Sequence, residues 1–355
     1  MTLSGNKGEW SEVYVLLKLL SDGCLHLGDA DLKPIEDIVY PIVTVLREYS
    51  NGWVHYIPDH PDIHISRDCG GEEVIISVAQ FTRSASQLFE YIQRLKGSSS
   101  MPELEDFLSK IHCLQLKAKS SSKADIHIQI HDPRIGVQPT LGFSIKSRLG
   151  NSATLLNASG ATNFVFTTGL QLTQDQQIQI NSIEVKSKIQ ERIFEIEKLG
   201  GNLVFERCEH SCFQSNLMMI DTMMPLVMSE VLKLYYSGKG SRLVDLLAII
   251  NQTNPLDLDL STHHFYEYKI KKLLVEIALG LQPNKVWDGV YDATGGYIVV
   301  KETGDLICYH FYDRNLLEDY LLRNTKLDTP SSSRHGFGTI TSDNRFKLNL
   351  QIRFI

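Results

Sequence analysis

The stretch ADIHIQIHDPRIGVQPTLGFSIKS, residues 124–147, alternates apolar and polar side chains, meets a Pro and a Gly, and then alternates again. Alternation with a period of two is typical of a half-buried strand, and Pro and Gly suit a chain reversal. The stretch therefore predicts a β-hairpin. It carries Asp125 near its start and Lys146 near its end, with no second acid beside the lysine.

The alternation also predicts which side chains share a face of the hairpin. Asp125 and His127 fall on one face of the first strand, and Ser144 and Lys146 fall together on the second. A tip between residues 135 and 136 would place Asp125 opposite Lys146. The pattern thus predicts an acid and a lysine facing each other on adjacent strands.

Such a pair has two interpretations. It is either an inert cross-strand ion pair, worth about 0.2–1 kcal/mol, or the centre of a magnesium-dependent phosphodiesterase. In the second case Asp125 and the backbone carbonyl of Ile145 would bind Mg²⁺, which needs few protein oxygens because it keeps waters. Lys146 would position and deprotonate the attacking water, and Ser144 would hold a metal-bound water or contact the phosphate. His127 would contact phosphate or line the groove.

The cysteines and histidines do not favour a zinc site. Cys208, His210 and Cys212 lie close together, but no second ligand pair follows at zinc-knuckle spacing. His127 and His131 are about 13 Å apart along a strand, too far to share one metal. We therefore expect free thiols.

Composition favours a globular protein with a local anion-binding surface. The chain has 355 residues, 43% of them hydrophobic, which is enough for one large domain or two. The sequence shows no apolar run of membrane-spanning length and no signal-peptide core, so we expect a cytoplasmic protein without a membrane partner. The net charge is −7. Residues 113–174 and 321–355 nevertheless each carry six basic and two acidic side chains, which indicates a basic groove or a solvated basic face.

Periodicity along the rest of the chain predicts an α+β protein with a mixed sheet. Strands are expected at 53–57, 74–78, 163–167 and 346–354, with a strand meander at 285–311 and a loop at 329–340. Helices are expected at 8–22, 35–49 with a kink at Pro41, 84–97, 101–112, 176–199, 241–252, 266–280 and 314–323.

The Asp125, Ser144 and Lys146 pattern resembles the PD-(D/E)xK nuclease core. More specifically, residues 7–23, 124–164, 324–338 and 346–354 together resemble the HpaII restriction endonuclease family, over essentially the whole chain. The resemblance implies a PD-(D/E)xK core, a mixed sheet flanked by helices. It also implies a nuclease core in residues 1–174, and a helical and β region for DNA recognition and dimerisation in 175–355, unless the chain forms one compact unit.

The sequence departs from that core in two places. Ala124 replaces the usual Pro, and Ser144 replaces the second carboxylate, so the metal would lose a charged ligand. The acid that compensates in some relatives, 12–13 residues after the lysine, is missing here. The start of the chain resembles the K-G-x-x-x-E pattern of archaeal Holliday-junction resolvases, which implies Glu12 as the second acid and Glu9 as its alternate. Otherwise both are ordinary first-turn acids that favour the helix dipole.

The resemblance further implies a type II restriction enzyme that uses Mg²⁺ and cuts double-stranded DNA at a short palindrome, with CCGG the best guess. Two-strand cleavage of a palindrome implies a homodimer. The alternatives are a structure-specific or repair nuclease on the same core, or a DNA-binding protein that does not cleave. The expected DNA contacts are polar or basic residues in two segments and one strand: Arg334, His335, Ser332, Ser333, Arg148, Asn151, Asn157 and His127. For the segment at 331–335 the other interpretation is a solvated turn.

Overall fold

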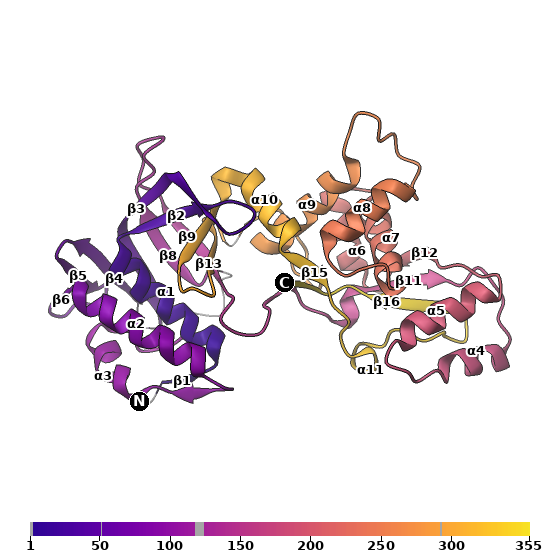
Figure 1. Ribbon diagram of the computed structural model, residues 1–355, viewed down its shortest axis with the longest axis horizontal. Coiled ribbons are helices and arrows are strands. Elements are labelled where there is room, and N and C mark those ends of the chain that lie inside the picture. The colour runs from indigo at the N-terminus through magenta and orange to yellow at the C-terminus, as the bar shows by residue number, and fades with distance from the viewer. Residues whose placement is uncertain (1–2, 51, 118–123, 292) are drawn as a thin grey trace. The chain divides into compact units, whose positions relative to one another are not determined.

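The computed structural model describes residues 3–50, 52–117, 124–291 and 293–355, and the chain divides into two compact units (Figure 1). The first unit takes residues 1–153 and 291–320, and the second takes 154–290 and 321–355. The chain therefore leaves the first unit and returns to it. The nuclease core at 1–174 and the recognition region at 175–355 stay a prediction about function, since the compact units divide the chain at other residues.

A nine-stranded mixed sheet organises the first unit. Its order is β2-β14-β13-β9-β8-β3-β4-β5-β6, and β2 also pairs with β3. The strands are β2 (Cys24–Gly28), β3 (Pro34–Tyr49), β4 (Gly52–Asp59), β5 (Asp62–Arg67), β6 (Val74–Ser77), β8 (Ile126–Ile130), β9 (Thr140–Ser147), β13 (Gly296–Val300) and β14 (Leu306–His310).

Part of this sheet closes on itself. Strand β2 pairs in parallel with β14 and antiparallel with β3, so β2, β14, β13, β9, β8 and β3 form a ring. Strand β9 is one of the strands of this ring, antiparallel to β8 on one side and parallel to β13 on the other. Both edges of β9 are therefore hydrogen-bonded, although β13 comes from a segment about 150 residues further along the chain.

The first unit has four α-helices among the described residues. They are α1 (Lys7–Asp22), α2 (Val78–Arg94), α3 (Pro102–Lys110) and α10 (Arg314–Arg323), which runs on into the second unit; η2 (Phe311–Asp313) and the short pair β1 (Ser4–Gly5) and β7 (Ser99–Ser100) complete it. Helix α2 packs on α1.

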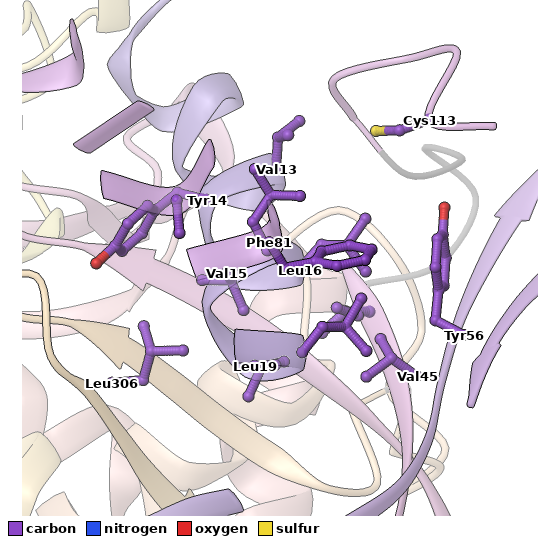
Figure 2. Close-up of a cluster of buried hydrophobic side chains, with 14 of the residues drawn as sticks. Val13, Tyr14, Val15, Leu16, Leu19, Val45, Tyr56, Phe81, Cys113 and Leu306 are labelled. Carbon is purple, nitrogen blue, oxygen red and sulfur yellow. The ribbon is translucent and has the colours of Figure 1, made fainter. Parts of the chain in front are cut away.

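Helix α1 is the centre of the core. It begins with a capping box between Asn6 and Glu9 and ends at Gly23, whose positive φ of 68° suits glycine. Its apolar residues, such as Val13 and Leu16, have no exposed surface, and α1 contacts α2, β3 and β9. Figure 2 shows these side chains converging with others from the sheet and α2. The buried helix fixes the position of its first turn beside β9.

The second unit combines two small sheets with a group of helices. One sheet has the order β10-β17-β15, the other β12-β11-β16. The strands are β10 (Thr154–Leu156), β11 (Asn163–Thr167), β12 (Val204–Cys208), β15 (Thr325–Leu327), β16 (Arg345–Asn349) and β17 (Ile352–Phe354). The helices are η1 (Gly160–Thr162), α4 (Gln174–Asn181), α5 (Lys188–Lys198), α6 (Ser211–Ile220), α7 (Met224–Tyr236), α8 (Leu243–Thr253), α9 (Phe265–Leu279) and α11 (Ser332–His335).

The α+β class with a mixed sheet is confirmed. The helices expected at 8–22, 84–97, 101–112, 241–252, 266–280 and 314–323 are present, as are the strands at 53–57, 74–78 and 163–167, with small shifts at the ends. The meander expected at 285–311 is the hairpin of β13 and β14.

The helix expected at 35–49 was wrong, because this segment is strand β3. Its apolar residues have helical spacing, but most of them are β-branched, and such side chains favour strands. Pro41 lies where β3 changes partner from β2 to β8, a position where its missing N–H costs no ladder bond.

Three further expectations need correction. The helix at 176–199 is two helices, α4 and α5, because the buried Arg192 donates hydrogen bonds to the carbonyls of Asn181 and Ile183 where α4 ends. The strand at 346–354 breaks at Leu350 into β16 and β17, which belong to different sheets. Part of the loop at 329–340 is the single helical turn α11, closed by Gly336 at a φ of 64°.

Candidate active site

The hairpin of β8 and β9 brings the expected acid, serine and lysine into one row. The amide of Asp125 donates to the carbonyl of Phe143 at 2.8 Å. Oδ2 of Asp125 accepts hydrogen bonds from the amide of Ile145 at 2.6 Å and from Oγ of Ser144 at 3.2 Å. Nζ of Lys146 donates to the same Oγ at 3.0 Å. The serine hydroxyl therefore links the acid to the lysine.

The predicted register of this hairpin was wrong by two residues. Ile126 pairs with Phe143, and the bridge between Asp132 and Val137 puts the tip between residues 134 and 135. Asp125 consequently lies level with Ser144 rather than with Lys146. A two-residue shift keeps every side chain on its predicted face, so the expected grouping of Asp125, Ser144 and Lys146 holds.

Lys146 sits in a partly dehydrated position. Its Nζ lies 5.0 Å from the centre of the buried Tyr297 ring of β13, within the range of a cation–π contact. Burial lowers the pKa of the Lys146 ammonium group, while the negative charges of Asp125 and Glu12 oppose the shift. The lysine is thus easier to deprotonate than a solvated lysine.

The two candidate acids of α1 have different surroundings. Glu9 accepts the Asn6 amide at 2.8 Å through Oε2, and its Oε1 lies 2.9 Å from Nζ of Lys117. These two contacts lower the pKa of the Glu9 carboxyl. Glu12, one turn further on, acts electrostatically on both Lys117 and Lys146. Glu9 therefore completes the capping box with Asn6, whereas Glu12 lines the cleft near Lys146.

Asp125, Lys146 and the two acids of α1 line one open cleft of about 950 Å³ in the first unit, whereas Ser144 and Tyr297 are buried and are not among its lining residues. Four lysines and three carboxylates lie on its walls, the carboxylates being Glu9, Glu12 and Asp125. The lysines are Lys7, Lys96, Lys117 and Lys146, and the remaining walls are Asn6, Gly8, Leu95, Gly97, Ile145, Ser147, Leu149, Gly150, Asn151 and Ala153. Mixed charge of this kind can hold a cation and a phosphate together.

The oxygen donors of the cleft fit Mg²⁺ better than a transition metal. Asp125, Glu12 and the carbonyl of Ile145 offer hard oxygen ligands, which suit an ion that keeps several waters. Within the described ranges, no cluster of three or more His, Cys, Asp or Glu side chains is arranged for a metal, Cys208, His210 and Cys212 included. These residues therefore offer no site of three or more His, Cys, Asp or Glu ligands for a transition metal.

The expected DNA contacts fall into three groups. Asn151 lines the cleft, and Arg148 follows β9 with its Nε 3.8 Å from Glu302. His127 is outside the walls of the cleft; it packs edge-on against Trp53 at 5.0 Å between ring centres, and burial lowers its pKa. The other expected contacts belong to the second unit, and they are Asn157, Ser332, Ser333, Arg334 and His335.

Three residues in or beside the cleft could not be assigned a role from the sequence. Lys117 was counted within a basic stretch, but nothing in the sequence distinguished it from its neighbours. Lys7 matched the K-G-x-x-x-E pattern without a role of its own. Tyr297 reaches Lys146 from β13, and no sequence signal links two positions so far apart.

An acid and a lysine on the wall of an open cleft, joined along one hairpin through a buried hydroxyl, match the arrangement expected of a phosphodiester hydrolase. The family model of the HpaII restriction endonuclease matches residues 6–354. The chain is also 48% identical over 359 residues to the type II restriction enzyme HpaII of Haemophilus parainfluenzae, covering 99% of each sequence. No solved structure matches the chain.

The chain therefore belongs to the HpaII restriction endonuclease family, which confirms the resemblance noted in the sequence. Its enzyme class is that of a type II site-specific deoxyribonuclease. A search of the described residues found no helix with the length and apolar character needed to cross a membrane.

Proposed function

We propose that the protein is a Mg²⁺-dependent restriction endonuclease on a PD-(D/E)xK core that cuts both strands of DNA at a short palindrome, with CCGG as the sequence. The observation that carries the proposal is the hydrogen-bonded row of Asp125, Ser144 and Lys146, whose acid and lysine line the cleft. Membership of the family supports the reaction and, through the relative from Haemophilus parainfluenzae, the restriction role.

Asp125, Glu12 and the carbonyl of Ile145 would hold the metal, with Glu9 retained as the cap of α1. Bound Mg²⁺ supplies charge neutralisation at the phosphate and lowers the pKa of water. The protein contributes a carboxylate of fixed orientation, because Oδ2 of Asp125 is held by two donors on β9. It also contributes a second acid on a rigid, buried helix.

Lys146 orients the attacking water and receives its proton at Nζ, a task suited to an amine of lowered pKa. Ser144 keeps Nζ in line through its hydroxyl, and it has no base arranged to make it a nucleophile. Attack on phosphorus then releases the 3′-oxygen and leaves a 5′-phosphate. The ring of Tyr297 contacts Nζ of Lys146 at 5.0 Å and excludes water from that side of the lysine.

Base recognition would come from Arg334, His335, Ser332 and Ser333 in α11, and from Arg148, Asn151, Asn157 and His127 near or beyond the hairpin. Arg334 is the best single candidate, because it carries a guanidinium on an exposed turn, and arginine is the commonest reader of guanine. A palindromic site would be met by a homodimer, and a cytoplasmic location would give the enzyme access to its DNA substrate.

The decisive experiment incubates the protein with unmethylated phage DNA in Mg²⁺ or in EDTA and sequences the ends of the products. We expect discrete fragments in Mg²⁺ alone, all ending within CCGG. Asp125→Asn and Lys146→Met should each reduce cleavage by at least about 100-fold without changing the circular dichroism spectrum.

Two exposed residues outside the cleft provide matched controls, Asp37→Asn on β3 and Lys110→Met on α3, and both should cleave at the normal rate. Full activity in Asp125→Asn or Lys146→Met would remove this active site. Discrete ends at another sequence would keep the nuclease and refute CCGG. Fragments of random ends would instead indicate a repair or structure-specific nuclease.

A further inference from the structure

A circuit of hydrogen bonds joins the first turn of α1 to the end of β9. Oγ of Ser11 donates to the carbonyl of Lys7 at 2.7 Å and lies 2.8 Å from Oγ of Ser147. The amide of Leu149 donates to Oγ of Ser147 at 3.2 Å. Nζ of Lys7 closes the circuit by donating to the carbonyl of Leu149 at 2.9 Å.

The two serines of this circuit are sequence neighbours of two proposed active-site residues. Ser11 directly precedes Glu12 on the helix, and Ser147 directly follows Lys146 on the strand. The bond between the two hydroxyls therefore joins the neighbours of two proposed active-site groups. Ser11 has no exposed surface, so its hydroxyl has little freedom to choose another partner.

We propose that Ser11 and Ser147 are positioning residues that set the distance between Glu12 and the row of Asp125, Ser144 and Lys146. The proposal rests on the proposed function, since it gives a purpose to the placement of Glu12. Without the link, α1 would still pack through its apolar residues, but its first turn could rotate or slide relative to β9. Because displacements of about 1 Å can cost about 100-fold in rate, the expected effect is on chemistry more than on folding.

The test compares Ser11→Ala, Ser147→Ala and the double variant with the conservative variant Ser147→Thr, which keeps a hydroxyl. Ser229→Ala is the matched control: Ser229 also has no exposed surface and bonds the carbonyl of Leu226 one turn earlier, but it lies in α7 of the second unit. Lys7 is left unchanged, because its charge could bind phosphate directly from the wall of the cleft. Ser147 also lines the cleft, so the buried Ser11→Ala shows whether an effect passes through the link.

Two properties are measured besides thermal stability. Binding of Mn²⁺ alone, without DNA, is followed by the electron paramagnetic resonance signal of the free ion. Single-turnover cleavage is measured at saturating Mg²⁺. We expect the alanine variants of Ser11 and Ser147 to bind Mn²⁺ about 10-fold more weakly and to cleave 10- to 100-fold more slowly. The double variant should resemble the single variants, because either change opens the same link.

Ser147→Thr should restore both properties, and Ser229→Ala should change only the melting temperature. Normal Mn²⁺ affinity and a normal cleavage rate in folded Ser147→Ala would overturn the proposal and leave a purely structural link. Ser147 is partly exposed, so this variant remains informative if Ser11→Ala does not fold.

A Glu12→Gln variant tests the proposed metal site separately from the positioning role of Ser11 and Ser147. Weakened Mn²⁺ binding in Glu12→Gln together with normal binding in the serine variants would refute the positioning role alone. Normal Mn²⁺ binding in Glu12→Gln would refute the proposed metal site, and the positioning role with it.

Discussion

The two acids at the start of α1 differ in what holds them. Glu9 closes the capping box with Asn6 and pairs with Lys117, so its charge is already used within the helix start. Glu12 stands one turn along, on the wall of the cleft and within electrostatic reach of Lys146. We therefore expect Glu9 to have a structural role and Glu12 a chemical one.

This difference predicts opposite results for two similar substitutions. Glu12→Gln should reduce single-turnover cleavage by about 100-fold or more, because it removes one charged metal ligand. Glu9→Gln should stay within about 5-fold of the wild-type rate, because glutamine can still complete a capping box. Quenched-flow cleavage of a short duplex measures both. Equal losses in the two variants would mean that the assignment of the second acid is wrong.

The sequence predicted correctly which side chains share a face of the hairpin, but it did not predict the register of the two strands. Period-two alternation placed Asp125, Ser144 and Lys146 on one side, and that grouping survives an error of two residues in register. The register itself depends on the conformation of the turn, where Gly136 takes a φ of 67°. Tyr297 could not be predicted, because a parallel neighbour such as β13 leaves no local signal in the strand it joins.

Among the elements, the short η2 segment depends on a buried histidine. His310 accepts the amide of Tyr312 through Nδ1 at 3.0 Å, stacks with the Tyr312 ring, and is only 1% exposed. Burial lowers the pKa of His310 to about 4 from 6.5, although Asp313 and Asp132 favour its charged form and Arg134 opposes it. The neutral imidazole is thus part of the folded structure.

We expect this histidine to make the protein sensitive to mild acid. The unfolded chain binds a proton near pH 6.5 and the folded one only near pH 4, so the free energy of unfolding is fully retained above pH 6.5 and falls as the pH drops toward 4. The loss from this residue is at most about 3 kcal/mol. Urea unfolding at several pH values should give a flatter profile for His310→Asn.

The matched control is His263→Asn, at an exposed position before α9 in the second unit, which should keep the wild-type profile. A His310→Asn protein with an unchanged pH dependence would show that other groups govern acid stability.

The break between α4 and α5 depends on one buried cation. Arg192, 2% exposed, donates to the carbonyls of Asn181, Ile183 and Gly338 and thereby connects α5 to the end of α4 and to the segment after α11. Arg192→Met would leave these carbonyls without that donor. We expect a loss of about 2–4 kcal/mol in the free energy of unfolding, measured by urea titration. Arg207→Met, half-exposed on β12, should lose less than about 1 kcal/mol.

Helix periodicity alone could not reveal this break, because the segment from 176 to 199 lacks Pro and has Gly only after its end. The helix stops where a side chain ten or so residues away captures its last carbonyls. Strand β3, in contrast, could have been predicted from its many β-branched residues. The helical spacing of its apolar residues was given more weight, and the prediction was wrong for that reason.

For the whole molecule, the path of the chain matters more than any local pattern. The first unit needs residues 291–320, because β13 and β14 complete the ring of strands that includes β9. A fragment of residues 1–174 should therefore lack cooperative thermal unfolding and cleavage activity, even though it contains Asp125, Ser144 and Lys146. Scanning calorimetry and the plasmid cleavage assay measure these properties.

A fusion of residues 1–153 to 291–320 through a Gly/Ser linker is the matched comparison, and it should unfold cooperatively. A stable, cooperatively folded 1–174 fragment would show that the ring is dispensable. Composition and periodicity could not predict that residues 291–320 are needed. They describe residues that are close in sequence, whereas the ring joins strands that are far apart in the sequence.

The late position of β13 also sets an order of events during synthesis. A ribosome has made Glu12, Asp125 and Lys146 long before it reaches Tyr297, the residue that covers the lysine. Until then β9 has an open edge and the cleft lacks one of its supporting strands. An incompletely translated chain, including one released early by a damaged message, would carry the proposed catalytic groups without the strand that supports them. Such a chain should not cut the DNA of the cell.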